Sequence, residues 1–75
     1  YRGINLDTIQ ALVEAKNLKE INKDILVENG LSSKNELVKI LGRGELKSSI
    51  SIAAHKFTKS AEEAINKVGG KAIVL

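Results

Sequence analysis

Hydrophobic residues recur at helical spacing in the first part of the chain. Residues 4–17 predict an amphipathic helix, because their apolar positions fall three or four residues apart, at Leu6, Ile9, Leu12 and Val13. Asn5 or Asp7 can cap its start, and the Asp7 carboxylate also complements the positive end of the helix dipole. One face of this helix is therefore expected to lie against a core.

A second, shorter helix is predicted within "EINKDILVENGL", and both of its ends are marked in the sequence. Asn22 is a natural N-cap, and Ile21 and Leu26 have the spacing of a hydrophobic staple around it. At the other end Gly30 can adopt the left-handed conformation while Leu31 folds back onto Leu26.

Two short strands are predicted next, on either side of the turn "GRGE". Residues 36–41 are apolar and β-branched, and either glycine of residues 42–45 can take a positive φ angle. Residues 46–53 alternate between two faces, one buried and one wet. The buried face is Leu46, Ser48, Ile50 and Ile52, and the wet face is Lys47, Ser49 and Ser51.

The last part of the chain predicts a helix and a final strand. Residues 58–70 form a helix that ends at Gly69, with a narrow apolar stripe of Ala61, Ala64, Ile65 and Val68. Residues 71–75 are a continuous apolar run, which is typical of a strand covered by helices. Residues 46–75 then form a βαβ unit with a right-handed crossover. The fold class is α/β: a short sheet packed by about three helices.

Composition agrees with one small globular domain spanning residues 1–75. Hydrophobic residues make up 43% of the 75 residues and charged residues 28%. The chain has no cysteine, which excludes disulfides and thiolate metal sites. No apolar run approaches the roughly 20 residues that span a bilayer. The absence of Met and the start at Tyr1 indicate a part of a longer protein.

Charge is distributed unevenly along the chain, although the formal net charge is only +3. Residues 1–38 hold five cations and six anions, whereas residues 39–75 hold seven cations and three anions. The asymmetry indicates a polyanionic partner for the second half. The alternative is a merely solvated basic surface.

Candidate catalytic and metal-binding groups are sparse. His55 is the only histidine, and its sequence neighbours offer no carboxylate to orient it. Glu62 and Glu63 are adjacent on a helix, so their side chains point about 100° apart and do not converge. We therefore expect no catalytic residues, no metal site and no cofactor.

The segment "AHKFTKSAEEA", residues 54–64, is a better candidate for holding an anion. Thr58 is the expected N-cap of the helix that follows, and the unpaired amides at its start lie beside His55, Lys56 and Lys59. This combination suits a phosphate oxygen. The alternative is an ordinary capped helix whose lysines point into water.

Two further features of this segment bear on that choice. Ser60 and Glu63 can form a capping box if the helix begins two residues later. Phe57 is expected to anchor the core. Because Tyr1 and Phe57 are the only aromatic residues, base stacking is not expected, and any RNA contact should be to phosphate, sugar hydroxyls and groove shape.

Residues 39–69, "KILGRGELKSSISIAAHKFTKSAEEAINKVG", carry a specific motif. It begins with a Lys, two aliphatics and two glycines in a fixed pattern, and continues with alternating aliphatics, a hydrophobic residue before Thr, and small and aliphatic helix positions. These positions are Lys39, Ile40, Leu41, Gly42, Gly44, Leu46, Ile50, Ile52, Phe57, Thr58, Ala61, Ile65 and Gly69. The motif resembles the signature of the L-fifteen/L-eighteen-e family of large-subunit ribosomal proteins, and the likeness covers essentially the whole chain.

The resemblance implies a compact α/β domain with irregular β-β-α turns and a structural, non-catalytic role. Such a domain binds large-subunit ribosomal RNA, supports subunit assembly and works in the cytoplasm, on the ribosome. Neighbouring ribosomal proteins are further expected partners, whereas membranes and DNA are not, and the isolated domain is expected to be a monomer. Family members carry a basic N-terminal arm, and nothing like it precedes Tyr1, so the chain corresponds to the C-terminal globular part.

The expected RNA-binding residues are the exposed groups around the signature: Lys39, Arg43, Lys47, His55, Lys56, Thr58, Lys59 and Lys71. Lys67, near a helix C-terminus, complements the helix dipole instead. An alternative interpretation is a protein-interaction module. In that case the near-neutral first half contacts a neighbouring ribosomal protein, and RNA is bound mainly by the arm.

Overall fold

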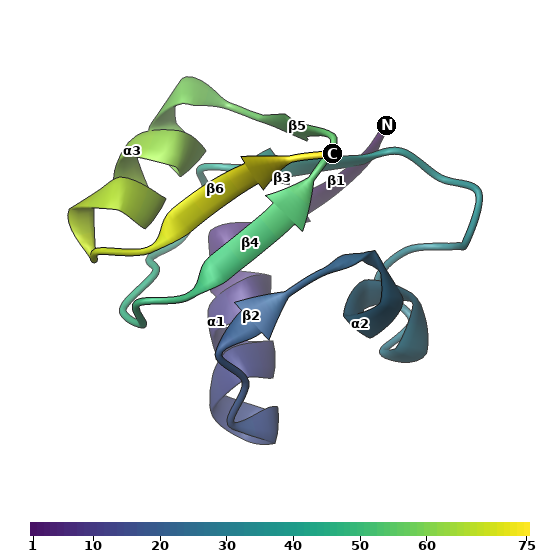
Figure 1. The fold of residues 1–75 in the computed structure, drawn as a ribbon, viewed down its shortest axis with the longest axis horizontal. Coiled ribbons are helices and arrows are strands. Elements are labelled where there is room, and N and C mark those ends of the chain that lie inside the picture. Colours follow the sequence, from purple (N-terminus) through teal and green to yellow (C-terminus); the bar gives the residue numbers. More distant parts are fainter.

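The computed structural model describes all 75 residues, which form three helices and six strands (Figure 1). In chain order the elements are β1 (Arg2–Asn5), α1 (Leu6–Lys16), β2 (Glu20–Ile21), α2 (Lys23–Glu28), β3 (Val38–Leu41), β4 (Ser51–Ala54), β5 (Lys56–Phe57), α3 (Lys59–Lys67) and β6 (Lys71–Val74). Every strand pair is parallel, and the strands form two sheets of order β1-β3-β5 and β2-β4-β6. The α/β class is confirmed, but two sheets stand where one short sheet was expected.

Helix α1 forms as predicted and buries its apolar face. Leu6, Ile9 and Val13 are buried, while Leu12 packs at the margin of the core. Asn5 occupies the N-cap position without a side-chain hydrogen bond, and Asp7 lies in the first turn. The helix ends at Asn17 in the left-handed conformation, with φ 54°.

Helix α2 confirms both predicted ends. The Asn22 side chain accepts a hydrogen bond from the Ile25 amide at 2.9 Å. Gly30 has a φ of 72°, and the Leu31 amide donates to the Leu26 carbonyl at 2.9 Å. Ile21 and Leu26, the staple pair, are both buried in the main core.

The strands differ from the sequence prediction in number and length. Strand β3 is confirmed, but the strand expected over residues 46–53 is regular only at β4, and residues 46–50 are irregular. Its inward alternation still holds, because Leu46, Ile50 and Ile52 are buried. Strands β1, β2 and β5 were not predicted; two of them contain only two residues, so pairing with distant strands, not local pattern, defines them.

Strand β6 lies parallel to β4 and completes the predicted βαβ unit through α3, although β5 intervenes. The expectation that helices cover this strand is wrong. Ile73 is 43% exposed and Val74 69% exposed. The reason is that β6 is an edge strand of its sheet, so its apolar run is not enclosed.

A single cluster of 14 buried residues forms the core. It joins residues of both sheets to helices α1 and α3, and its fully buried members include Leu6, Ile40, Ile52 and Ile65. Phe57 packs against the cluster from its margin, as expected for a core anchor. None of the helices combines the length and apolar character needed to cross a membrane.

A buried glutamine replaces strand pairing in the irregular segment after β3. The Gln10 Oε1 atom accepts hydrogen bonds from the amides of Lys47 and Ser48, at 2.8 and 3.2 Å. Its Nε2 atom donates to Glu14 Oε1 at 2.9 Å and to Ser48 Oγ at 3.2 Å. Helix α1 thereby holds this segment in place, with all the polar atoms of the Gln10 side chain satisfied.

Candidate nucleic-acid interface

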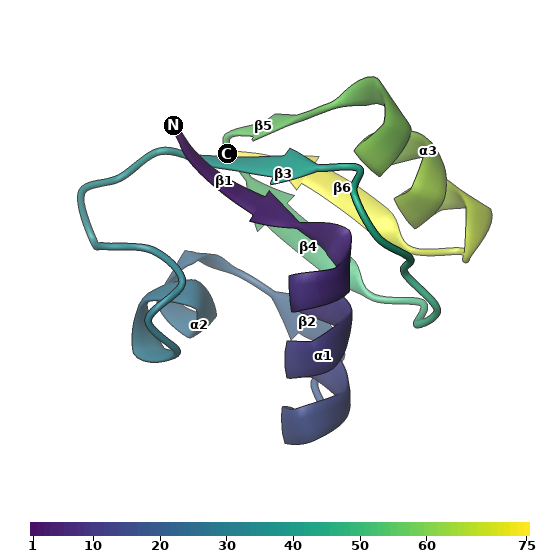
Figure 2. The same ribbon diagram turned by 180° about the vertical axis from the view of Figure 1, so that it is seen from behind.

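The loop after β3 packs closely against the N-termini of two helices (Figure 2). A Cβ atom on Gly42 would meet the Ser60 side chain and lie 2.8 Å from the Ala61 amide nitrogen, at the start of α3. A Cβ atom on Gly44 would meet the Asp7 side chain and lie 2.7 Å from the Asp7 amide nitrogen, at the start of α1. Between them, the Arg43 carbonyl accepts a hydrogen bond from the Asp7 amide at 3.3 Å. Arg43 is therefore held between two positive helix ends, with its side chain exposed.

Thr58 joins the start of α3 to this loop. Its Oγ1 atom accepts hydrogen bonds from the Ala61 amide at 3.2 Å and from the Gly42 amide at 3.1 Å. The predicted N-cap is confirmed, and the later helix start with Ser60 as cap is not adopted. The amides of Lys59 and Ser60 lie in the first turn of α3, where no helical carbonyl can reach them.

Replacing Thr58 with alanine should lower the free energy of unfolding by about 1–2 kcal/mol, because the cap is lost. The Gly42 amide also loses its acceptor, so the loop should loosen. Chemical denaturation measures the change. Thr58→Ser, which keeps the oxygen, should retain most of the stability, and equal losses in both variants would contradict the role of the hydroxyl.

Lys39 and Lys56 lie directly opposite each other on the paired strands β3 and β5. Residues in register on parallel strands point to the same face, and on β3 the alternate residues Val38 and Ile40 are the buried ones. The position beside Lys39 on β1 is Gly3, so no carboxylate occupies the adjoining site. Two like charges in register are unfavourable for the sheet alone, and an external anion would relieve them.

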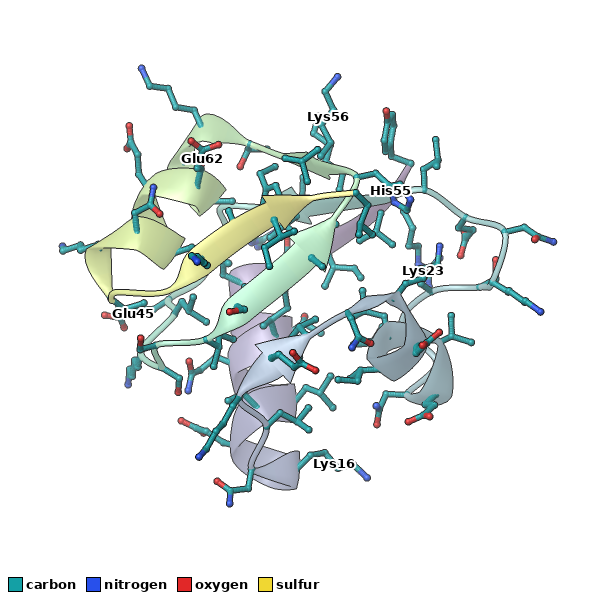
Figure 3. The ribbon with its side chains drawn as sticks, in the orientation of Figure 1. Lys16, Lys23, Glu45, His55, Lys56 and Glu62 are labelled. Atoms are coloured by element: carbon teal, nitrogen blue, oxygen red, sulfur yellow. The ribbon has the colours of Figure 1, made fainter.

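His55 is partly committed to structure. Its amide donates to the Val38 carbonyl at 3.0 Å, and its Nδ1 atom accepts from the Val38 amide at 3.0 Å. Only Nε2 therefore remains to contact a ligand, as an N–H donor. Figure 3 shows His55 near the end of β4 and Lys56 projecting outward from β5. No carboxylate forms a hydrogen bond with the imidazole, so it lacks the orienting partner of a catalytic base.

The remaining predicted cations follow the loop of residues 42–50 toward β6. Lys47 is exposed on this loop, and its far end is fixed to β6 where the Lys71 amide donates to the Ile50 carbonyl at 3.0 Å. Lys59 is exposed beside Gly42. The eight predicted residues thus separate into two groups. Lys39, His55 and Lys56 lie where β3 and β5 begin, and Arg43, Lys47, Thr58, Lys59 and Lys71 lie along the loop and the start of α3.

Lys19 is a basic residue that sequence reasoning missed. It lines a shallow depression of about 250 Å³ together with Lys71, Ser49, Ile50, Ser51, Gly69 and Gly70. The approach of Lys19 to Lys71 depends on the pairing of β2 with β4 and of β4 with β6. Because β2 has only two residues, no sequence signal places Lys19 beside the second half of the chain.

Carboxylates are also present near the loop. Glu45 lies on it and Glu62 in the first turn of α3, and Figure 3 shows both at the end of the molecule away from His55. They divide the positive surface into separate points and do not gather into a metal site. No group of three or more His, Cys, Asp or Glu side chains is placed to hold a metal ion.

Comparison with known proteins gives a consistent family. Residues 3–73 match the family described as ribosomal proteins 50S-L15 and 50S-L18e, with their counterpart in the 60S subunit. The chain belongs to this family. It is 58% identical over 76 residues to the large ribosomal subunit protein uL15 of Christiangramia forsetii, which covers all of this chain and 51% of that protein.

Two further relatives agree with this assignment. The uL15 proteins of Flavobacterium johnsoniae and Amoebophilus asiaticus are 49% and 51% identical, in each case over the whole of this chain. The alignments cover 51% and 49% of those proteins, so the chain spans about half the length of the curated relatives it matches. Membership of a ribosomal protein family agrees with the non-enzymatic role expected from the sequence.

In this chain of the L15/L18e family the signature residues prove to be scaffold. Gly42 and Gly44 allow the loop to approach two helices, Ala61 and Ile65 are buried, and Thr58 caps α3. The exposed cations stand around this scaffold. The signature therefore positions the candidate interface, and most of the interface's charges come from residues outside it.

Proposed function

We propose that this domain, residues 1–75, is the globular part of a structural constituent of the large ribosomal subunit. It binds ribosomal RNA through phosphate and sugar contacts and supports assembly of the subunit on cytoplasmic ribosomes. The observation that carries the proposal is the pair Lys39 and Lys56, held in register on β3 and β5 with no carboxylate beside them.

The arrangement of the other cations supports the same function. Arg43 and Lys59 each follow the same two strands, two residues after β3 and β5 end. They lie roughly 10 Å along the strands from the first pair, which allows separate phosphates to be contacted. The unpaired amides at the start of α3 add donors for a phosphate oxygen. Lys47 and Lys71 extend the surface, and His55 can add its Nε2–H.

Replacing Lys56 and Lys59 together with alanine tests this surface. Binding to a fragment of large-subunit ribosomal RNA should weaken about tenfold, with a slope of log Kd against log salt smaller by about 2, since each lost phosphate contact lowers the slope by about 1. The fragment is titrated at several salt concentrations. Both lysines are exposed, so the fold should not change.

Lys16→Ala combined with Lys34→Ala is the matched control. Both lysines are exposed, on α1 and on the loop before β3, and the double change removes the same charge. If the two double variants lower the slope equally, binding reflects net charge alone and the interface is misplaced. An unchanged slope for the first variant would remove Lys56 and Lys59 from the RNA-facing surface.

Contact with neighbouring ribosomal proteins is the second candidate function. The first half of the chain is near neutral, and its helices α1 and α2 carry exposed carboxylates and lysines in similar numbers. RNA would then be bound mainly by parts of the longer protein outside these 75 residues. Loss of RNA binding on changing Lys56 and Lys59 favours the first candidate over this one.

A further inference from the structure

The large exposed hydrophobic side chains all lie at one end of the molecule. Backbone hydrogen bonds connect them: Arg2 donates to Leu37, His55 to Val38, and Leu75 to Ala54, at 2.6, 3.0 and 2.8 Å. Figure 1 draws both termini at this end. We name this surface the apolar end, and it consists of Tyr1, Leu37, Ile73, Val74 and Leu75. Gathering of exposed apolar residues at one place is typical of an interaction surface.

Strand β6 adds an open set of backbone groups to the apolar end. The Lys71 and Leu75 amides donate to the Ile50 and Ala54 carbonyls of β4 and its approach. Since backbone groups of alternate residues point to opposite sides of a strand, the amides of Ala72 and Val74 point away from β4. No strand pairs with β6 on that side. Unpaired edges are a template for another strand unless something covers them.

The charges next to the apolar end are positive. Arg2 follows Tyr1, and the Lys56 Nζ atom lies 5.7 Å from the centre of the Tyr1 ring. The nearby carboxylate of Glu36 is already used, because it accepts a hydrogen bond from the Ser33 amide at 2.8 Å. That bond is the main reason that the pKa of Glu36 lies below its ordinary value, and the charges of Arg2 and Lys23 add to the effect.

We propose that the apolar end and the outer edge of β6 bind an extended segment of another protein, which adds to the sheet as a strand. Its apolar side chains cover Ile73, Val74 and Leu37, and its carboxylates face Arg2 and Lys56. Backbone hydrogen bonds provide affinity in such additions, and alternate side chains provide specificity. This surface is distinct from the first-half surface of the second candidate function.

Charge decides between this occupant and the others. RNA would supply anions but nothing to cover the aliphatic side chains of β6. A second copy of the chain, placed symmetrically, would bring a second Arg2 and Lys56 against the first, and like charges facing each other are unfavourable. An acidic segment with alternating apolar residues satisfies both the charges and the apolar surface.

The experiment uses the full-length protein with peptides of about eight residues, a length typical of strands. One peptide alternates Val with Glu and the other alternates Val with Lys. The acidic peptide should slow hydrogen exchange of the Ala72 and Val74 amides, whereas the basic peptide should not. In Val74→Pro the outward donor is lost while the bonds to β4 remain, so binding of the acidic peptide should weaken about tenfold, as for one lost hydrogen bond together with local packing.

Several results would overturn the proposal. They are equal binding of both peptides, no binding of the acidic peptide, or an unchanged affinity in a folded Val74→Pro variant. Protection of Ala72 and Val74 before any peptide is added would assign the edge to the protein's own chain, or to a second copy if the protection rises with concentration. Binding of the ribosomal RNA fragment should be the same in Val74→Pro, so a failure here is distinguishable from a failure of the RNA interface.

Discussion

Replacement of Gly44 by alanine is expected to lower the free energy of unfolding by about 3 kcal/mol. Gly44 has a φ of 91°, a conformation that costs other residues about 1–2 kcal/mol. The added Cβ would also meet Asp7, whose amide nitrogen is 2.7 Å away in the helix backbone and cannot yield freely. Overpacking of this kind adds a cost of about 1–3 kcal/mol. Urea or thermal unfolding monitored by circular dichroism measures the loss.

Gly30→Ala is the matched control for this prediction. Gly30 also has a positive φ, of 72°, but no heavy atom lies within 4 Å of its added Cβ. It should therefore lose only the conformational part, about 1–2 kcal/mol. Equal losses in the two variants would show that Gly44 is needed for its backbone conformation alone, and that the loop does not press against α1.

Gln10→Ala is expected to cost about 2–3 kcal/mol of unfolding free energy. The substitution removes the acceptor of the Lys47 and Ser48 amides, and each lost partner of a largely buried group costs about 1–3 kcal/mol. Water can reach part of the exposed Lys47 backbone, which keeps the total below the full sum. Hydrogen exchange of these two amides should accelerate together with the fall in stability.

Glu14→Ala and Ser48→Ala separate the two halves of the Gln10 side chain. Each removes one acceptor of Nε2 and leaves both bonds to Oε1 intact. Losses of about 1 kcal/mol or less are expected, as for single hydrogen bonds near the surface. If either variant is as damaging as Gln10→Ala, the clamp on residues 46–48 is not the main role of Gln10.

The parts of the fold that could be predicted are those whose determinants are local. The caps of α2 and α3 depend on Asn22 and Thr58 bonding to amides three residues away, so sequence reveals them. Strands β2 and β5 have two residues each and exist because of distant partners. Residues 71–75 read as a buried strand, since an apolar run does not reveal that β6 lies at an edge.

The candidate interface was predictable as a set of residues but not as an arrangement. Charge asymmetry and the capped helix pointed to Lys56 and Lys59 from sequence alone. The register that sets Lys39 against Lys56, and the approach of Lys19 to Lys71, come from parallel pairing between segments far apart in the chain. The use of His55 Nδ1 by the Val38 amide likewise depends on a contact across 17 positions.

The central claim is that RNA meets the surface formed by β3, β5, the loop after β3 and the start of α3. Its most direct test is the change in amide chemical shifts when a fragment of large-subunit ribosomal RNA is added to the labelled protein. The predicted result is that the largest changes fall at Lys39, Arg43, Lys56, Lys59 and the Ser60 amide, with little change in α2. Changes concentrated in α1 and α2, or at Ile73 and Val74, would contradict it.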